Sequence, residues 1–146
     1  MMKRLLQLVI LAAVLYAGYE YLKPWIPEWG GDAQLQGSDE EKCVARLDLT
    51  RDEIVDKAQK WMGPPVQVSR WAGAHRLLIG RMNEARRQCQ CDGAGCEEGI
   101  EAFQILDRTL EEIDREMRAG REVDVRSELR DFEEQLAESR RALSAY

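Results

Sequence analysis

The sequence predicts an all-α protein, in which one N-terminal transmembrane helix precedes a small disulfide-stapled helical bundle. We expect the bundle to be built from a bent arm and an antiparallel helical hairpin. Two observations point to this class: a continuous apolar run follows a basic N-terminus, and apolar residues then recur at spacings of three and four. In addition, no segment shows the alternation of apolar and polar residues that is typical of a strand.

The apolar run from Leu5 to Leu22 contains 18 residues, of which only Gln7 and Glu20 are strongly polar. At about 1.5 Å per residue it spans roughly 27 Å as a helix, close to the ~30 Å thickness of a hydrocarbon core. We therefore expect a transmembrane signal-anchor over residues 5–23 that contacts the lipid bilayer.

Charge on the two sides of this run predicts its orientation. Residues 1–4 include Lys3 and Arg4, so the positive-inside rule makes them a cytoplasmic tip. The C-terminal part is then exported, into the periplasm or another extracytoplasmic space. A cleavable signal peptide is the alternative, but its best cleavage site, Leu15-Tyr16-Ala17, has the bulky Leu15 where a small residue is preferred, so we expect an uncleaved single-pass protein.

A juxtamembrane linker is expected at 24–37, where Trp25 and Trp29 are placed to meet lipid headgroups. The exported helical domain is then 38–146, long enough for one modest core. Residues 30–146 carry 25 acidic and 18 basic residues, a net charge of −7. This charge disfavours nucleic acid as a partner.

Two capping-box patterns, Ser38 with Glu41 and Thr50 with Glu53, predict short helices over 39–47 and 51–62. The run of Gly63, Pro64 and Pro65 then predicts a sharp break, because proline cannot continue a preceding helix. A long middle helix over 67–90 is predicted by one apolar stripe, made of Val68, Trp71, His75, Leu78, Met82, Ala85 and Cys89.

The segment Cys91–Cys96 contains two glycines and is expected to be a turn. Two further apolar stripes follow, separated by the helix-ending signal Gly120, and they predict an antiparallel hairpin that packs on the middle helix. The stripes are Ile100, Phe103, Leu106, Leu110, Ile113 and Met117, then Val125, Leu129, Phe132, Leu136 and Leu143.

Charge is divided unequally among the predicted helices. Residues 66–90 carry five arginines and one glutamate, whereas 97–146 carry 15 acidic residues and 8 arginines. We expect the basic helix to lie against the acidic hairpin of its own domain. The alternative is an arginine strip that binds an acidic partner or phosphate. Gly73 and Gly80 allow another helix to approach closely, and we expect that helix to belong to the same domain.

Four cysteines allow three disulfide pairings, and a Cys89–Cys91 bridge would close too tight a ring. Counted from Pro64, Cys43 lies 21 residues back and Cys89 lies 25 residues on, so two antiparallel arms bring them level. We therefore expect the pairs Cys43–Cys89 and Cys91–Cys96.

Four thiolates could instead hold a metal ion such as zinc, which makes Cys43, Cys89, Cys91 and Cys96 an alternative metal site. The C-x-C spacing and the expected oxidising compartment disfavour it. His75 is the only histidine and lies in an apolar stripe, so we expect a core or boundary residue. We find no catalytic signature and expect neither a catalytic site nor a cofactor.

These features predict a membrane-tethered envelope protein whose exported domain binds other proteins, as a subunit, adaptor or scaffold. We call the break at residues 63–65 the elbow. The candidate partner-binding residues lie in it or on either side of it: Trp61, Pro64, Pro65 and Trp71. The sequence is also compatible with a homo-oligomer. A cysteine-dependent metal-binding or redox-sensing membrane protein is the main alternative. A spanin-type lysis protein is a weaker one, because its long rod does not suit the breaks at 63–65 and Gly120.

Overall fold

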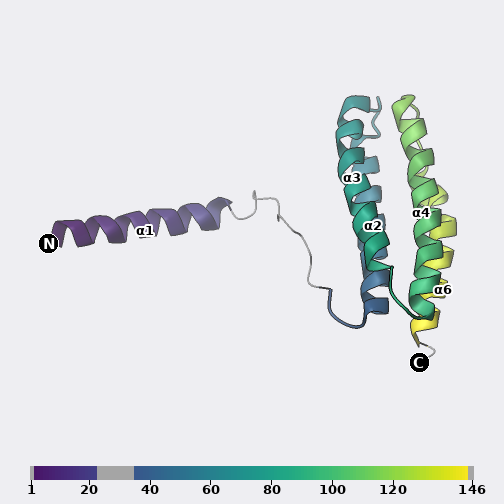
Figure 1. Cartoon of the computed structure of the whole chain (residues 1–146). Helices are drawn as coiled ribbons and strands as arrows, with labels where there is room; N and C mark the ends of the chain where they lie inside the picture. Colours follow the sequence, from purple (N-terminus) through teal and green to yellow (C-terminus); the bar gives the residue numbers. More distant parts are fainter. Residues whose placement is uncertain (1, 23–34, 145–146) are drawn as a thin grey trace. The chain divides into compact units, whose positions relative to one another are not determined.

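A computed structural model describes residues 2–22 and 35–144, with side chains up to Tyr19 in the first stretch. The chain forms two units, 1–34 and 35–146, and each is described by itself. Every regular element in the described residues is a helix (Figure 1), which confirms the predicted all-α class.

The first unit contains helix α1, Met2–Leu22. Its window Met2–Tyr19 is long and apolar enough to cross a membrane, with a mean hydropathy of 1.4, and none of it is buried by the rest of the chain. Helix α1 begins three residues before the expected span. The expected linker and its tryptophans, Trp25 and Trp29, lie outside the described residues.

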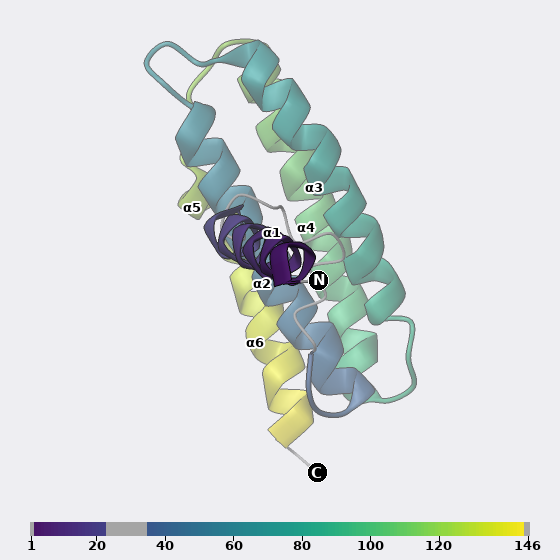
Figure 2. The same ribbon diagram turned by 90° about the vertical axis from the view of Figure 1, so that its left-hand side faces the viewer.

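The second unit is a bundle of four long helices and one short helix (Figures 1 and 2). Successive long helices run in opposite directions, so that α2 with α3 and α4 with α6 form two hairpins. Helices α2 and α4 contact each other and both of the remaining long helices, whereas α3 and α6 do not touch. The elements are α2 (Asp39–Trp61), α3 (Val68–Gln88), α4 (Ala94–Arg118), α5 (Val125–Glu128) and α6 (Arg130–Ser144).

The prediction of two short helices before the elbow is wrong, because α2 is continuous. Ser38 does form the expected capping box with Glu41 at the start of α2. Thr50, by contrast, is buried within the helix, and its hydroxyl donates a hydrogen bond of 2.8 Å to the carbonyl of Arg46. The buried stripe runs through this point from Leu47 to Ile54, so burial of one continuous face outweighs the local capping signal.

The interpretation of Cys91–Cys96 as a turn throughout is also wrong, because α4 already begins at Ala94. The Glu40 carboxylate of α2 accepts a hydrogen bond of 2.8 Å from the backbone N–H of Gly95, and so satisfies a free donor in the first turn of α4. This contact lies 55 positions away in sequence, which explains why a local pattern could not reveal it.

Helix α4 ends as predicted at Gly120, which has a φ of 76°. The N–H of Arg121 donates to the carbonyl of Glu116 at 2.9 Å, and that of Gly120 donates to Met117 at 3.1 Å. These two bonds form a Schellman motif. Since the chain turns back here and at the elbow, residues 35–144 form a bundle and not the long rod of a spanin-type protein.

Each long helix of the bundle supplies one face to a single core. Gly99 of α4 lies where the start of α2 and the end of α3 meet, and a Cβ at this position would overlap the Cys43 sulfur and lie 3.5 Å from that of Cys89. The largest fully buried side chains are Trp71, Phe132, Leu47, Ile54, Leu78, Leu106, Leu110, Ile113, Met117 and Leu136.

The difference between buried and open glycines yields a stability prediction. Gly99→Ala should lower the free energy of unfolding by about 1 to 3 kcal/mol, because the added methyl overpacks the core beside the sulfurs. The matched control Gly80→Ala should raise it by about 1 kcal/mol, because nothing lies within 4 Å of the added Cβ and alanine favours a helix. Urea unfolding followed by circular dichroism measures both, and equal effects would contradict the packing at Gly99.

Candidate functional site

Three of the four candidate partner-binding residues at the elbow between α2 and α3 reach the surface. Pro64 and Pro65 are exposed, and Trp61 is half-buried at the end of α2. Two cations lie over the Trp61 ring: the Lys60 ammonium at 5.0 Å from the ring centroid and the Arg70 guanidinium at 5.8 Å. The outer part of this ring therefore sits in a basic surrounding.

Trp71 does not belong to the elbow surface, which corrects the sequence-based assignment. Its side chain is 0% exposed and packs in the core, and its indole N–H donates a hydrogen bond of 2.9 Å to Asp114 of α4. The ring also lies 6.0 Å from that of His75. Trp71 falls on the stripe of α3 that faces α2 and α4, so the position on the helix decides its burial.

Asp114 is the centre of a small polar cluster between α3 and α4. Besides the Trp71 indole, the Arg118 guanidinium donates to both Asp114 oxygens, at 2.8 and 3.0 Å. The His75 imidazole nitrogen Nε2 lies 3.8 Å from the second oxygen. A carboxylate held by these donors is suited to joining two helices, so the cluster is a structural link.

Burial lowers the pKa of His75 below its usual value, and the nearby Arg118 charge adds to that effect. The Asp114 carboxylate acts in the opposite direction but does not outweigh burial. His75 is therefore a boundary residue that favours its neutral form in the folded chain.

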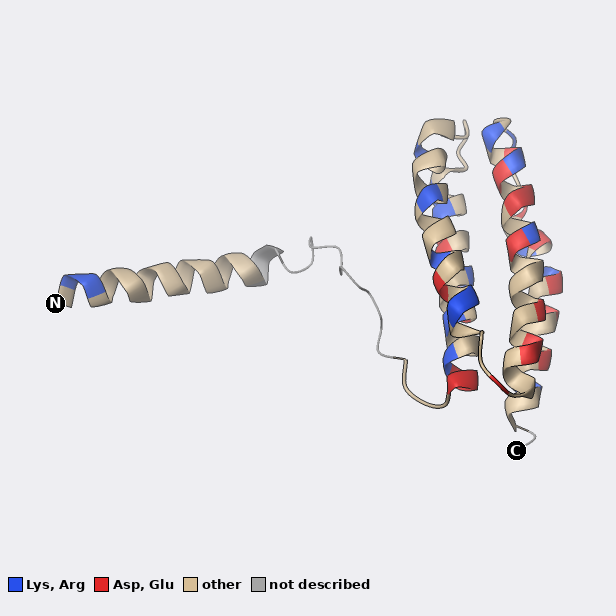
Figure 3. Ribbon diagram, viewed as in Figure 1, with Lys and Arg blue, Asp and Glu red and all other residues tan. Residues whose placement is uncertain are grey.

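The basic helix lies against α4 of the acidic hairpin, as expected, but none of its arginines forms an ion pair with a described residue of that hairpin. Among the described residues, Arg76, Arg86 and Arg87 are exposed and make no ion pair. Arg81 pairs with Glu53 of α2 at 3.2 Å. Figure 3 shows basic residues together with acidic ones along α2 and α3, and mainly acidic residues along α4 and α6. The arginines of α3 lie off its buried face and therefore remain at the surface.

A shallow groove of about 490 Å³ runs between α2 and α3 beside these arginines, and sequence reasoning missed it. Leu77 lines this groove with a relative exposure of 66%, although it is a large apolar residue. The signal that could have found it is its position outside the buried stripe of the middle helix. Gly73 and Gly80 are also open to solvent, so the expectation that they pack inside the domain is wrong.

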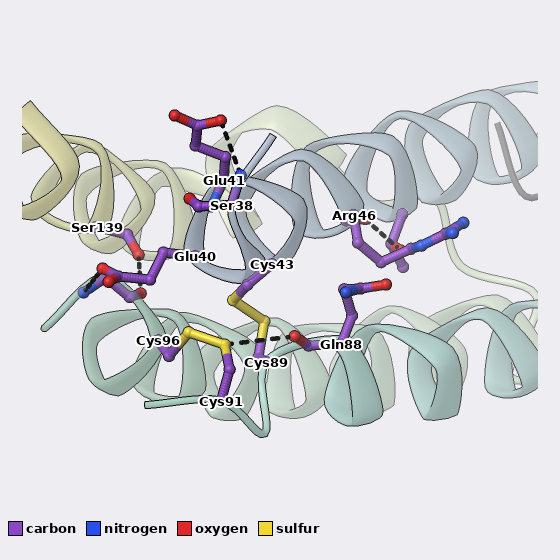
Figure 4. Close-up of a disulfide and its surroundings, with 12 residues drawn as sticks. Ser38, Glu40, Glu41, Cys43, Arg46, Gln88, Cys89, Cys91, Cys96 and Ser139 are labelled. Carbon is purple, nitrogen blue, oxygen red and sulfur yellow. Dashed lines mark hydrogen bonds between the residues drawn. A yellow bond between two sulfur atoms is a disulfide. The ribbon is translucent and has the colours of Figure 1, made fainter. Parts of the chain in front are cut away.

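All four cysteines form disulfides, Cys43 with Cys89 and Cys91 with Cys96, and these are the pairs that the spacing favours (Figure 4). The Cα atoms of the first pair lie 4.6 Å apart and those of the second 5.6 Å apart. No thiolate is left to bind zinc while these bonds are intact. The described residues also contain no cluster of three or more histidine, cysteine or carboxylate side chains that could hold a metal.

Comparison with known proteins does not extend the assignment: no protein family matches the chain, and neither a curated protein nor a solved structure does.

The disulfides yield a second prediction. Replacing Cys43 and Cys89 together with serine should cost about 4 kcal/mol of stability, since this bond constrains a long loop in the unfolded chain. Replacing Cys91 and Cys96 together should cost only about 2 kcal/mol, because their loop is short. Urea unfolding tests the order, and non-reducing peptide mapping tests the pairs. Recovery of Cys43 joined to Cys91 or Cys96 would contradict the pairing.

The environment of His75 yields a third prediction, on how stability depends on pH. The folded-state pKa of His75 lies below that of the unfolded chain, so the unfolded chain binds a proton more readily as the pH falls. Stability should therefore decline from about pH 6.5 downward, and His75→Gln should remove that part of the decline. Thermal melts between about pH 7.5 and pH 5.5 compare the two chains. Parallel curves for both chains would show that His75 does not contribute.

Proposed function

We propose that this chain is a single-pass membrane protein with a cytoplasmic N-terminus, whose exported helical domain binds other proteins of the membrane or envelope. One observation carries the proposal: a fully exposed apolar helix and a doubly disulfide-bonded bundle occur in the same chain. An apolar surface of this size needs a covering phase such as a lipid bilayer. Disulfides persist in oxidising compartments, such as the periplasm.

The mechanism that suits these parts is tethering. An anchor holds the bundle at the membrane and raises its effective concentration near other membrane proteins. The bundle then supplies the recognition surface, as a subunit, adaptor or scaffold. Support comes from the apolar groups that remain at its surface, the half-buried Trp61 at the elbow and the exposed Leu77 on α3. Tryptophan is typical of interface centres, which makes Trp61 the stronger of the two candidates.

The anchor is tested on the protein extracted from native membranes. Its intact mass should correspond to the uncleaved chain, and the protein should stay with the membrane in alkaline carbonate. Under denaturing, non-reducing conditions it should show no free thiols, as expected for an oxidising compartment. A chain that begins at Gly18, or that is wholly soluble, would remove the tether from the proposal.

Partner binding at the elbow gives a fourth prediction. Trp61→Ala should weaken co-purification of a protein partner from crosslinked native membranes, by roughly 30-fold in affinity if Trp61 contributes about 2 kcal/mol as an interface hot spot. The matched control is Leu49→Ala, which truncates an exposed apolar side chain on the outer face of α2.

Circular dichroism and thermal melting show whether each variant stays folded, which matters because Trp61 also packs against the core. A folded Trp61→Ala variant that retains every partner would exclude the elbow as the recognition site. Absence of any partner of the wild-type chain would reject the binding function itself.

A further inference from the structure

The outer face of α3 has no partner within the described bundle. Helix α3 contacts α2 and α4 only, and its buried stripe faces those two helices. Ser69, Arg76, Gly80 and Arg87 lie on the opposite side, in one line along the helix at spacings of seven, four and seven residues. All four are exposed. We call this line, with the neighbouring Leu77, the α3 outer face.

The line of residues on the α3 outer face carries cations only, and Glu53 and Asp56 of the neighbouring α2 line the groove beside Arg76 and Leu77. Glu84 is the only carboxylate on α3, and it pairs with Arg81 at 3.4 Å and with Arg46 of α2 at 3.8 Å. Arg76 and Arg87 are left without an ion pair to any described residue. The domain is acidic overall, and these two arginines are cations that remain available to an acidic partner.

The face also allows close approach of another backbone. A Cβ built on Gly73 or Gly80 would meet no atom within 4 Å, so the surface beside Leu77 is low and open. Glycine inside a helix is unfavourable compared with alanine, and nothing in the described structure requires it at these two positions. An exposed leucine beside two glycines can accept an apolar residue of a helix that packs closely.

We propose that the α3 outer face binds an acidic amphipathic helix of a partner protein, which extends the proposed tethering function by naming the chemistry of the partner. The complementary helix carries carboxylates about 11 residues apart, to meet Arg76 and Arg87, which lie about 16 Å apart along the axis. Between them it carries small or apolar residues that cover Leu77 and Gly80.

Charge favours an acidic helix over two other partners for this face, a second copy of the chain and an anionic lipid surface. A symmetric pair of α3 faces from two copies of this chain would bring the two arginine rows together, and like charges across an interface oppose binding. An anionic lipid surface attracts the arginines but repels the rest of the domain, which has a net charge of −7 over residues 30–146.

The test uses the full chain in its native membranes, with the photo-crosslinking residue p-benzoylphenylalanine in place of Leu77. Control chains carry it in place of Leu49 or Trp61. Mass spectrometry identifies the crosslinked peptide. We expect an adduct with a segment of another protein that has a net negative charge and a helical apolar pattern.

Charge and shape variants then test how the adduct forms. The double change Arg76→Glu and Arg87→Glu should reduce the Leu77-site adduct at least ~tenfold, whereas Arg126→Glu, an exposed arginine on α5, should not. Gly80→Gln should also reduce the adduct, without lowering the melting temperature. Reversing the carboxylates of the captured segment to lysine should restore binding to the doubly reversed chain.

Four results would overturn the proposal: an adduct with a second copy of the chain, an adduct with lipid, no Leu77-site adduct at all, or an adduct that charge reversal does not affect. Adducts that form only at the Leu49 or Trp61 sites would reject the α3 outer face while leaving tethered protein binding intact. If no site yields a protein adduct and nothing co-purifies, the proposed function fails as well.

Discussion

The bundle depends on the disulfide between Cys43 and Cys89, which closes the open end of the α2–α3 hairpin. The other end is closed by the short chain at the elbow, so the two helices are joined at both ends. Their Cα atoms at the disulfide lie only 4.6 Å apart, and both sulfurs are buried. Gly99 lets α4 lie directly on this bond, since any side chain there would overlap the sulfur of Cys43. The position of the second hairpin therefore follows from the closure of the first.

A polar junction forms next to this bond. The Glu40 carboxylate of α2 accepts the Gly95 N–H of α4, and the Ser139 hydroxyl of α6 donates to the Gly95 carbonyl at 2.9 Å. Three helices thus meet at one residue that has no room for a side chain, because a Cβ on Gly95 would lie 2.9 Å from a methyl of Leu143. Farther along, the Asp114 cluster links α3 to α4. The core is consequently held by directional bonds at more than one level along its length.

The arrangement of the helices also decides which charges reach the surface. Because α2 and α4 take the two central places, α3 and α6 each keep one side free. The free side of α3 carries arginines, whereas residues 97–146, which include α4 and α6, carry 15 acidic residues and 8 arginines. Such a division of charge contributes little to stability, since exposed ion pairs are each worth about 0 to 1 kcal/mol. It does place a row of arginines on one side of an acidic domain, which suits selective contact with other proteins.

The sequence by itself determined the helical class, the apolar first helix, the cap at Ser38, the end of α4 at Gly120 and the favoured cysteine pairs. Each of these depends on residues close together in the chain or on simple counting along two arms. Only the tertiary structure decided that α2 runs through Thr50, that α4 begins at Ala94 and that Trp71 is buried while Leu77 is exposed. The physical reason is the same in each case. Burial against a distant helix, or a hydrogen bond such as that from Gly95 to Glu40, outweighs the preference of the local sequence.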